Sequence, residues 1–113
     1  MELEFESQTL KKKCESGKIF RKDEYMNTRL TKVLRDLEAS STLLDIKLNK
    51  SLHLHPLKWS RKFELAIDID GRKNPYRLVF ETLNGENVCE DFYNNNIFKT
   101  VTEIKILDIT DYH

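Results

Sequence analysis

The stretch from Asp23 to Ala39 constrains the fold of this chain most, because its apolar residues recur at the spacing of one helix face. Charged residues surround that face, whose apolar positions are Met26, Leu30, Val33, Leu34 and Leu37. A helix with a single apolar stripe has to bury it against another layer of secondary structure. The sequence therefore predicts an amphipathic helix that packs on a second element.

The first residues of the chain predict a strand and then a short helix. Leu3 and Phe5 alternate with glutamates, which is the pattern of a strand with one wet face. Ser7 is suited to cap a helix that runs through the Lys11–Lys13 basic run, and Gly17 is suited to end it. After the longer helix, the segment 43–52 shows no clear period, and we expect it to be irregular.

The second half of the chain is predicted to be mostly extended. Residues 63–70 alternate apolar and polar, turn residues follow, and a second extended run covers 76–83, which predicts a hairpin. A turn at 84–85, a polar segment and a closing strand over 104–109 complete the order. We therefore predict one α+β domain over residues 1–113, with a small, mostly antiparallel sheet and two N-terminal helices packed on one face.

Composition and sequence signals favour a cytoplasmic protein, and no cofactor is predicted. The chain has 113 residues, enough for one domain with a real core. No apolar run is long enough to span a bilayer, and the acidic start does not resemble a secretory signal, so no membrane association is expected. In a reducing compartment, Cys14 and Cys89 are predicted to be free thiols.

The charges balance over the whole chain but are unevenly distributed. The formal net charge is zero, which gives no global argument for binding nucleic acid. Bases outnumber acids between Lys47 and Arg77, and acids outnumber bases from Leu78 onward. The sequence thus allows a local basic surface around the middle strands, although such blocks are often only solvated faces.

Two short segments carry the residue types of nucleotide chemistry. The first is His55-Pro56-Leu57-Lys58, with an imidazole and a cation, and the second is Asp111-Tyr112-His113, with a carboxylate, a phenol and an imidazole. Such groups can transfer protons, stack on a base and meet phosphate charge.

In these segments the chain resembles the HigB-type toxins of the RelE/ParE superfamily, small ribosome-associated endoribonucleases of bacterial type II toxin–antitoxin systems. The resemblance rests on four segments in the same order as in the family, the first near the start of the chain and the last at its end. These segments are Phe5-Glu6-Ser7 into Thr9-Leu10-Lys11-Lys12, Leu54-His55-Pro56-Leu57-Lys58 with Arg61-Lys62, Tyr76-Arg77-Leu78-Val79-Phe80, and Asp111-Tyr112-His113.

The resemblance implies a RelE/ParE-like fold and a metal-independent mRNA endonuclease that acts in the ribosomal A site and inhibits translation. It also implies neutralisation by a cognate helix-turn-helix antitoxin, similar to HigA. Two departures stand out: Trp59 occupies the place of a family glycine, and about Val88 to Val101 form an insertion. The insertion is expected to be a short helix or a loop near the site.

The site residues carried over from the matching motifs are His55, Lys58, Arg77, Asp111, Tyr112 and His113. RNA cleavage without a metal needs the 2′-hydroxyl deprotonated, the leaving 5′-oxygen protonated and phosphoryl charge met by cations. The two histidines suit the proton transfers, in either assignment, and Lys58 and Arg77 suit the phosphate. Tyr112 suits stacking on a base, and Asp111 suits fixing an imidazole tautomer.

Other interpretations of the same residues remain open at this point. Arg77 could be an ordinary cross-strand ion pair, and the last three residues could be a frayed tail. His53 and His55 could hold zinc with His113 and a cysteine, although the spacing lacks a paired-ligand motif. The whole chain could instead be a ParE-like toxin that binds DNA gyrase without catalysis, or an RNA-binding module without toxicity.

Overall fold

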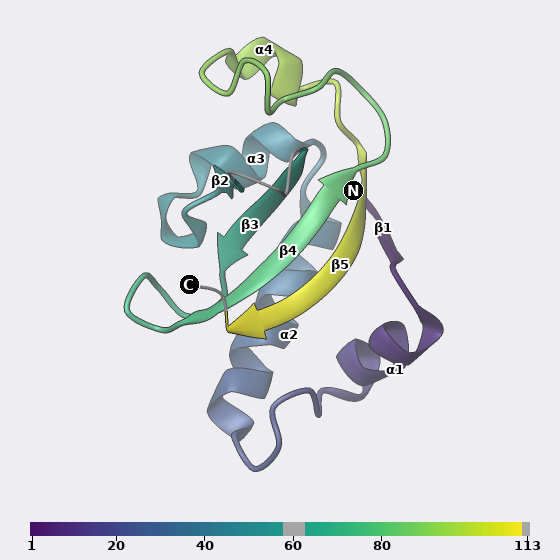
Figure 1. The fold of residues 1–113 in the computed structure, drawn as a ribbon, viewed down its shortest axis with the longest axis vertical. Coiled ribbons are helices and arrows are strands. Elements are labelled where there is room, and N and C mark those ends of the chain that lie inside the picture. Colours follow the sequence, from purple (N-terminus) through teal and green to yellow (C-terminus); the bar gives the residue numbers. More distant parts are fainter. Residues whose placement is uncertain (58–62, 112–113) are drawn as a thin grey trace.

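A five-stranded sheet and a set of mainly N-terminal helices form the chain in a computed structural model that describes residues 1–57 and 63–111 (Figure 1). The elements are β1 (Glu2–Phe5), α1 (Gln8–Ser16), α2 (Glu24–Ala39), α3 (Leu43–Leu48), the 3-10 helix η1 (Lys50–Leu52), β2 (His55–Pro56), β3 (Glu64–Asp68), β4 (Tyr76–Thr82), α4 (Asn95–Phe98) and β5 (Glu103–Asp111). The strand order is β1-β5-β4-β3-β2.

The sheet is mostly antiparallel, as predicted. The β1 strand pairs parallel with β5, and the other three pairings are antiparallel. A register shift in the β4–β5 pair pairs Val79 with Asp108 and Phe80 with Ile106, so Leu107 is the extra residue of a bulge. The predicted hairpin is confirmed as β3 and β4, and the predicted last strand extends beyond 104–109 at both ends.

Both N-terminal helices begin and end where local chemistry favours it. The Ser7 hydroxyl accepts a hydrogen bond from the Leu10 backbone N–H at 3.1 Å, and Gly17 ends α1 in the left-handed region at φ 66°. Asp23 caps α2 through the Met26 backbone N–H at 3.1 Å. The predicted apolar stripe of α2 is buried along its whole length.

The prediction of an irregular segment over 43–52 is wrong, because this segment forms α3 and η1. The Asp45 carboxylate accepts from the Ser41 backbone N–H at 2.9 Å and from that of Thr42 at 3.5 Å, which satisfies donors ahead of the first turn. Leu43 and Ile46, three residues apart, are both buried on one side of α3. The apolar spacing is helical, but it lasts for less than two turns.

The two faces of the sheet bury different residues. Leu65 and Ile67 of β3, with Leu78 and Phe80 of β4, join the main core beneath α2 and α3. The alternate positions point to the other face, where a small second cluster contains Leu57, Ala66 and Val79, with Leu107 packed against it. Asp68 of β3 and Arg77 of β4 also project to this second face.

The insertion forms part of the core at one end of the sheet. Val88, Phe98 and Val101 are at most 1% exposed and belong to the main core. Lys47 of α3 anchors the segment, because its ammonium lies 4.4 Å from the Phe98 ring centroid and donates to the Asn95 side chain at 2.7 Å. In Figure 1, α4 lies at the opposite end of the sheet from the β3–β4 hairpin loop.

Two further expectations concern the cysteines and the membrane. Cys14 and Cys89 are both free, as predicted. Burial raises the pKa of the Cys14 thiol to about 11. None of the helices in the described ranges is long and apolar enough to cross a bilayer.

Candidate functional site

The buried carboxylate of Asp68 forms the centre of the candidate site. Asp68 is only 1% exposed, and its register partner across the hairpin is Arg77. The Arg77 Nε lies 3.0 Å from Asp68 Oδ1, so the two side chains form a cross-strand ion pair on the second face of the sheet. This pair was one of the open interpretations of Arg77, and it accounts for the burial of the acid.

Most of the remaining N–H donors of Arg77 bind backbone carbonyls in and next to the hairpin loop. One terminal nitrogen donates to the Tyr76 carbonyl at 2.9 Å and to the Asn74 carbonyl, and the other donates to the Arg72 carbonyl at 3.1 Å. A guanidinium has five N–H donors, so these contacts leave little capacity for a ligand. Arg77 therefore orders the loop between β3 and β4, and its role toward phosphate stays a prediction.

His53 lies beside this ion pair in an uncommon backbone conformation. It ends η1 with φ 47° and ψ 57°, in the left-handed region, which turns its side chain toward β3. Its Nδ1 lies 3.6 Å from Asp68 Oδ2. Burial lowers the pKa of His53, the Arg72 charge lowers it further, and Asp68 acts in the opposite direction.

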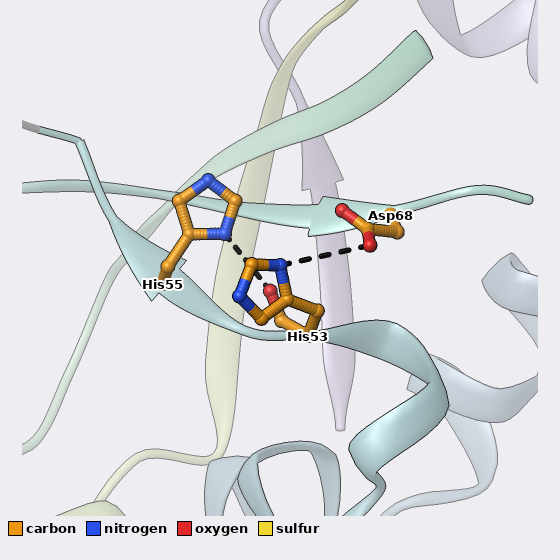
Figure 2. Close-up of side chains that lie close together, drawn as sticks. All are labelled: His53, His55 and Asp68. Atoms are coloured by element: carbon orange, nitrogen blue, oxygen red, sulfur yellow. Dashed lines mark hydrogen bonds and ion pairs between the residues drawn. The ribbon is translucent and has the colours of Figure 1, made fainter. Parts of the chain in front are cut away.

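His55 is held in one orientation by the backbone of His53. Its Nδ1 lies 2.8 Å from the His53 carbonyl oxygen, and Figure 2 shows both imidazoles next to Asp68. A carbonyl oxygen only accepts hydrogen bonds, so Nδ1 must carry the proton in this contact. In neutral His55 the free lone pair is therefore on Nε2.

An open depression of about 400 Å³ is lined by His53 and by several basic side chains. It is lined by Arg29, Lys50, Ser51, His53, Asp68, Asp70, Gly71 and Arg72. Asp70 pairs with Arg29 at 3.3 Å, and Asp68 pairs with Arg77. The charges of Lys50 and Arg72 are left without a carboxylate partner among the residues that the structure describes, so the depression is locally positive.

The sheet register places Asp111 on the opposite face from His55 and Arg77. Asp111 pairs with Tyr76, whose ring packs against the main core, whereas Arg77 pairs with Thr110. Because directly paired residues project to the same face, Asp111 belongs to the face that carries the helices. His55 pairs with Ala66 and lies on the other face with Asp68 and Arg77.

Three predicted site residues, Lys58, Tyr112 and His113, lie outside the described residues, as does Trp59. Two residues of the observed cluster were not predicted as nuclease residues from the sequence. His53 could have been suspected from its spacing to His55. Asp68 could only have been found from the register that sets it opposite Arg77, which the sequence alone does not fix.

Two comparisons with known proteins were negative. A search of protein-family models found no match to the chain, and a search of curated proteins found no significant one.

Proposed function

We propose that this protein is the toxin of a type II toxin–antitoxin system, a ribosome-dependent endoribonuclease with a RelE/ParE-like fold. The observation that carries the proposal is His55, whose Nδ1 is held by the His53 carbonyl at 2.8 Å. This contact leaves Nε2 free to act as a base, and His53, which holds the ring, lines the locally positive depression. The motifs that resemble HigB-type toxins supply the substrate class.

In the proposed reaction, Nε2 of His55 accepts the proton of a ribose 2′-hydroxyl. The 2′-oxygen then attacks the adjacent phosphorus, and the bond from phosphorus to the leaving 5′-oxygen breaks. The products are a 2′,3′-cyclic phosphate and a 5′-hydroxyl, which takes its proton from the general acid. With His55 as the base, the acid role falls to His113, and no metal is required.

The cations of the site have separate proposed roles. Lys58 meets the charge that develops on the phosphoryl oxygens. Arg77 keeps Asp68 compensated and holds the hairpin loop, so most of its contribution is positional. Tyr112 stacks on a base. Asp111, at the end of β5 on the helix-bearing face, fixes an imidazole tautomer.

The proposed partners are those that the resemblance implies. Messenger RNA in the ribosomal A site is the substrate, and a helix-turn-helix antitoxin similar to HigA neutralises the toxin. A second candidate, a ParE-like toxin that binds DNA gyrase without catalysis, is favoured by the use of most Arg77 donors within the chain.

Expression of the chain alone in bacteria tests these functions. We expect protein synthesis to stop first, measured by incorporation of labelled amino acids, with thymidine incorporation falling later. His55→Ala should abolish the effect, because proton transfer by a placed side chain contributes about 100- to 10,000-fold. Primary loss of DNA synthesis would favour the gyrase-binding alternative, and full toxicity of His55→Ala would refute the nuclease mechanism.

A further inference from the structure

Two buried polar atoms in the site face each other without forming a hydrogen bond. They are His53 Nδ1 and Asp68 Oδ2, which lie 3.6 Å apart (Figure 2). Within the described ranges, neither atom has a hydrogen-bond partner. Buried polar atoms are nearly always partnered, so two that approach in this way indicate a further group that binds both.

The separation of these atoms suits a tetrahedral metal ion. Zinc binds histidine nitrogen and carboxylate oxygen at about 2.0 to 2.2 Å, which sets two ligands of one ion about 3.4 Å apart. The observed 3.6 Å is close to this value and is longer than a normal N–H to O hydrogen bond.

His55 supplies a third ligand from the neighbouring strand. One ligand atom from each of His53, His55 and Asp68 lies within 4.8 Å of the others, and the two imidazole centroids are 4.9 Å apart. Figure 2 shows that Nδ1 is the His55 nitrogen on the side of His53, so coordination through Nδ1 would replace its hydrogen bond to the His53 carbonyl.

The Asp68 ligand is oriented by a neighbouring residue, as ligands usually are in metal centres. Arg77 holds the other oxygen of Asp68. Ligating histidines and carboxylates are usually oriented by such outer contacts. The depression lined by His53 and Asp68 gives an ion access from solvent and leaves room for a water ligand.

We infer that His53, His55 and Asp68 form a site for a divalent transition metal, with zinc as the best match to these ligands, and that the bound ion inhibits the enzyme. The inhibition rests on the proposed function, because zinc on Nδ1 of His55 would leave the ring proton on Nε2 and so remove the base that starts the reaction. Arg72 and Arg77 repel a cation, so the affinity should be well below that of a structural zinc site.

Zinc binding to the purified full-length chain tests the site directly. Competition with a coloured chelator should show one equivalent bound, with an affinity at least about 10-fold weaker in His53→Asn and in Asp68→Asn. Asparagine tolerates the left-handed backbone of position 53, so that variant should keep its fold even where Asp68→Asn does not.

Two control variants separate this site from other ligands. Asp70→Asn changes an acid that lines the same depression, and Cys89→Ser removes the more exposed thiol. Both should bind zinc like the parent. Absence of zinc binding in the parent, equal affinity in His53→Asn, or loss only in Cys89→Ser would overturn the site.

A cleavage assay at fixed magnesium tests the inhibition, with each variant compared with its own zinc-free rate. We expect micromolar zinc to slow the parent, a chelator to restore it, and His53→Asn to respond much less. Zinc that binds without slowing cleavage would overturn the inhibitory role. A parent chain that binds zinc through His53 and Asp68 but cleaves no RNA would refute the proposed function and leave the metal site standing.

Discussion

At the scale of single residues, His53 serves the site through two different groups. Its carbonyl oxygen orients His55, and its imidazole faces the buried carboxylate of Asp68. The left-handed backbone at φ 47° makes both contacts possible, because it turns the chain from η1 into β2. A substitution at position 53 therefore removes the second contact and spares the first, provided that the backbone keeps its conformation.

A substitution of Arg77 can distinguish a role in positioning Asp68 and the hairpin loop from a role in catalysis. Arg77→Ala leaves Asp68 buried without its cation and should lower the free energy of unfolding by about 3–5 kcal/mol, measured by chemical denaturation. Arg72→Ala is the control and should change stability by no more than about 0.5 kcal/mol. In conditions where the variant is folded, the single-turnover cleavage rate should fall more than ribosome binding, as it should for Lys58→Ala. Equal losses of both would make these cations docking residues.

At the scale of elements, the short helix α3 depends on its first turn. Asp45 accepts hydrogen bonds from two backbone N–H groups ahead of the helix, and α3 carries Lys47, which holds the insertion. Asp45→Ala should therefore lower the free energy of unfolding by about 0.5–2 kcal/mol. Lys32→Ala removes an exposed i,i+4 pair with Asp36 and should cost at most about 0.5 kcal/mol. Similar small costs in both variants would show that the cap contributes little.

The elements also show which features a sequence can predict. The α2 helix was predictable because sixteen residues repeat one period, and Ser7 and Gly17 mark the ends of α1 by local chemistry. The α3 helix was missed because its apolar spacing is too short to establish a period. The site depends on strand pairing that a sequence does not reveal. The two-residue strand β2 forms only by pairing with β3, and Asp68 lies opposite Arg77 because of the hairpin register. The motif identifies His55 as a candidate, but the backbone carbonyl that orients it could not be predicted.

At the scale of the whole molecule, the insertion and the Asp68–Arg77 pair occupy different ends of the sheet. The α4 segment lies away from the β3–β4 hairpin loop in Figure 1, and Phe98 is fully buried in the main core. The insertion contains the short helix α4, one of the two expected forms, and it packs into the main core. Phe98→Ala should lower the free energy of unfolding by about 3–5 kcal/mol, because it removes a large ring from a packed core. The single-turnover cleavage rate of the folded fraction should stay at the parent value, because His55 keeps its contact with His53.

Tyr93→Ala, at an exposed position of the same segment, is the control and should change neither quantity. If Phe98→Ala slowed cleavage at temperatures where it is fully folded, the two ends of the sheet would be coupled.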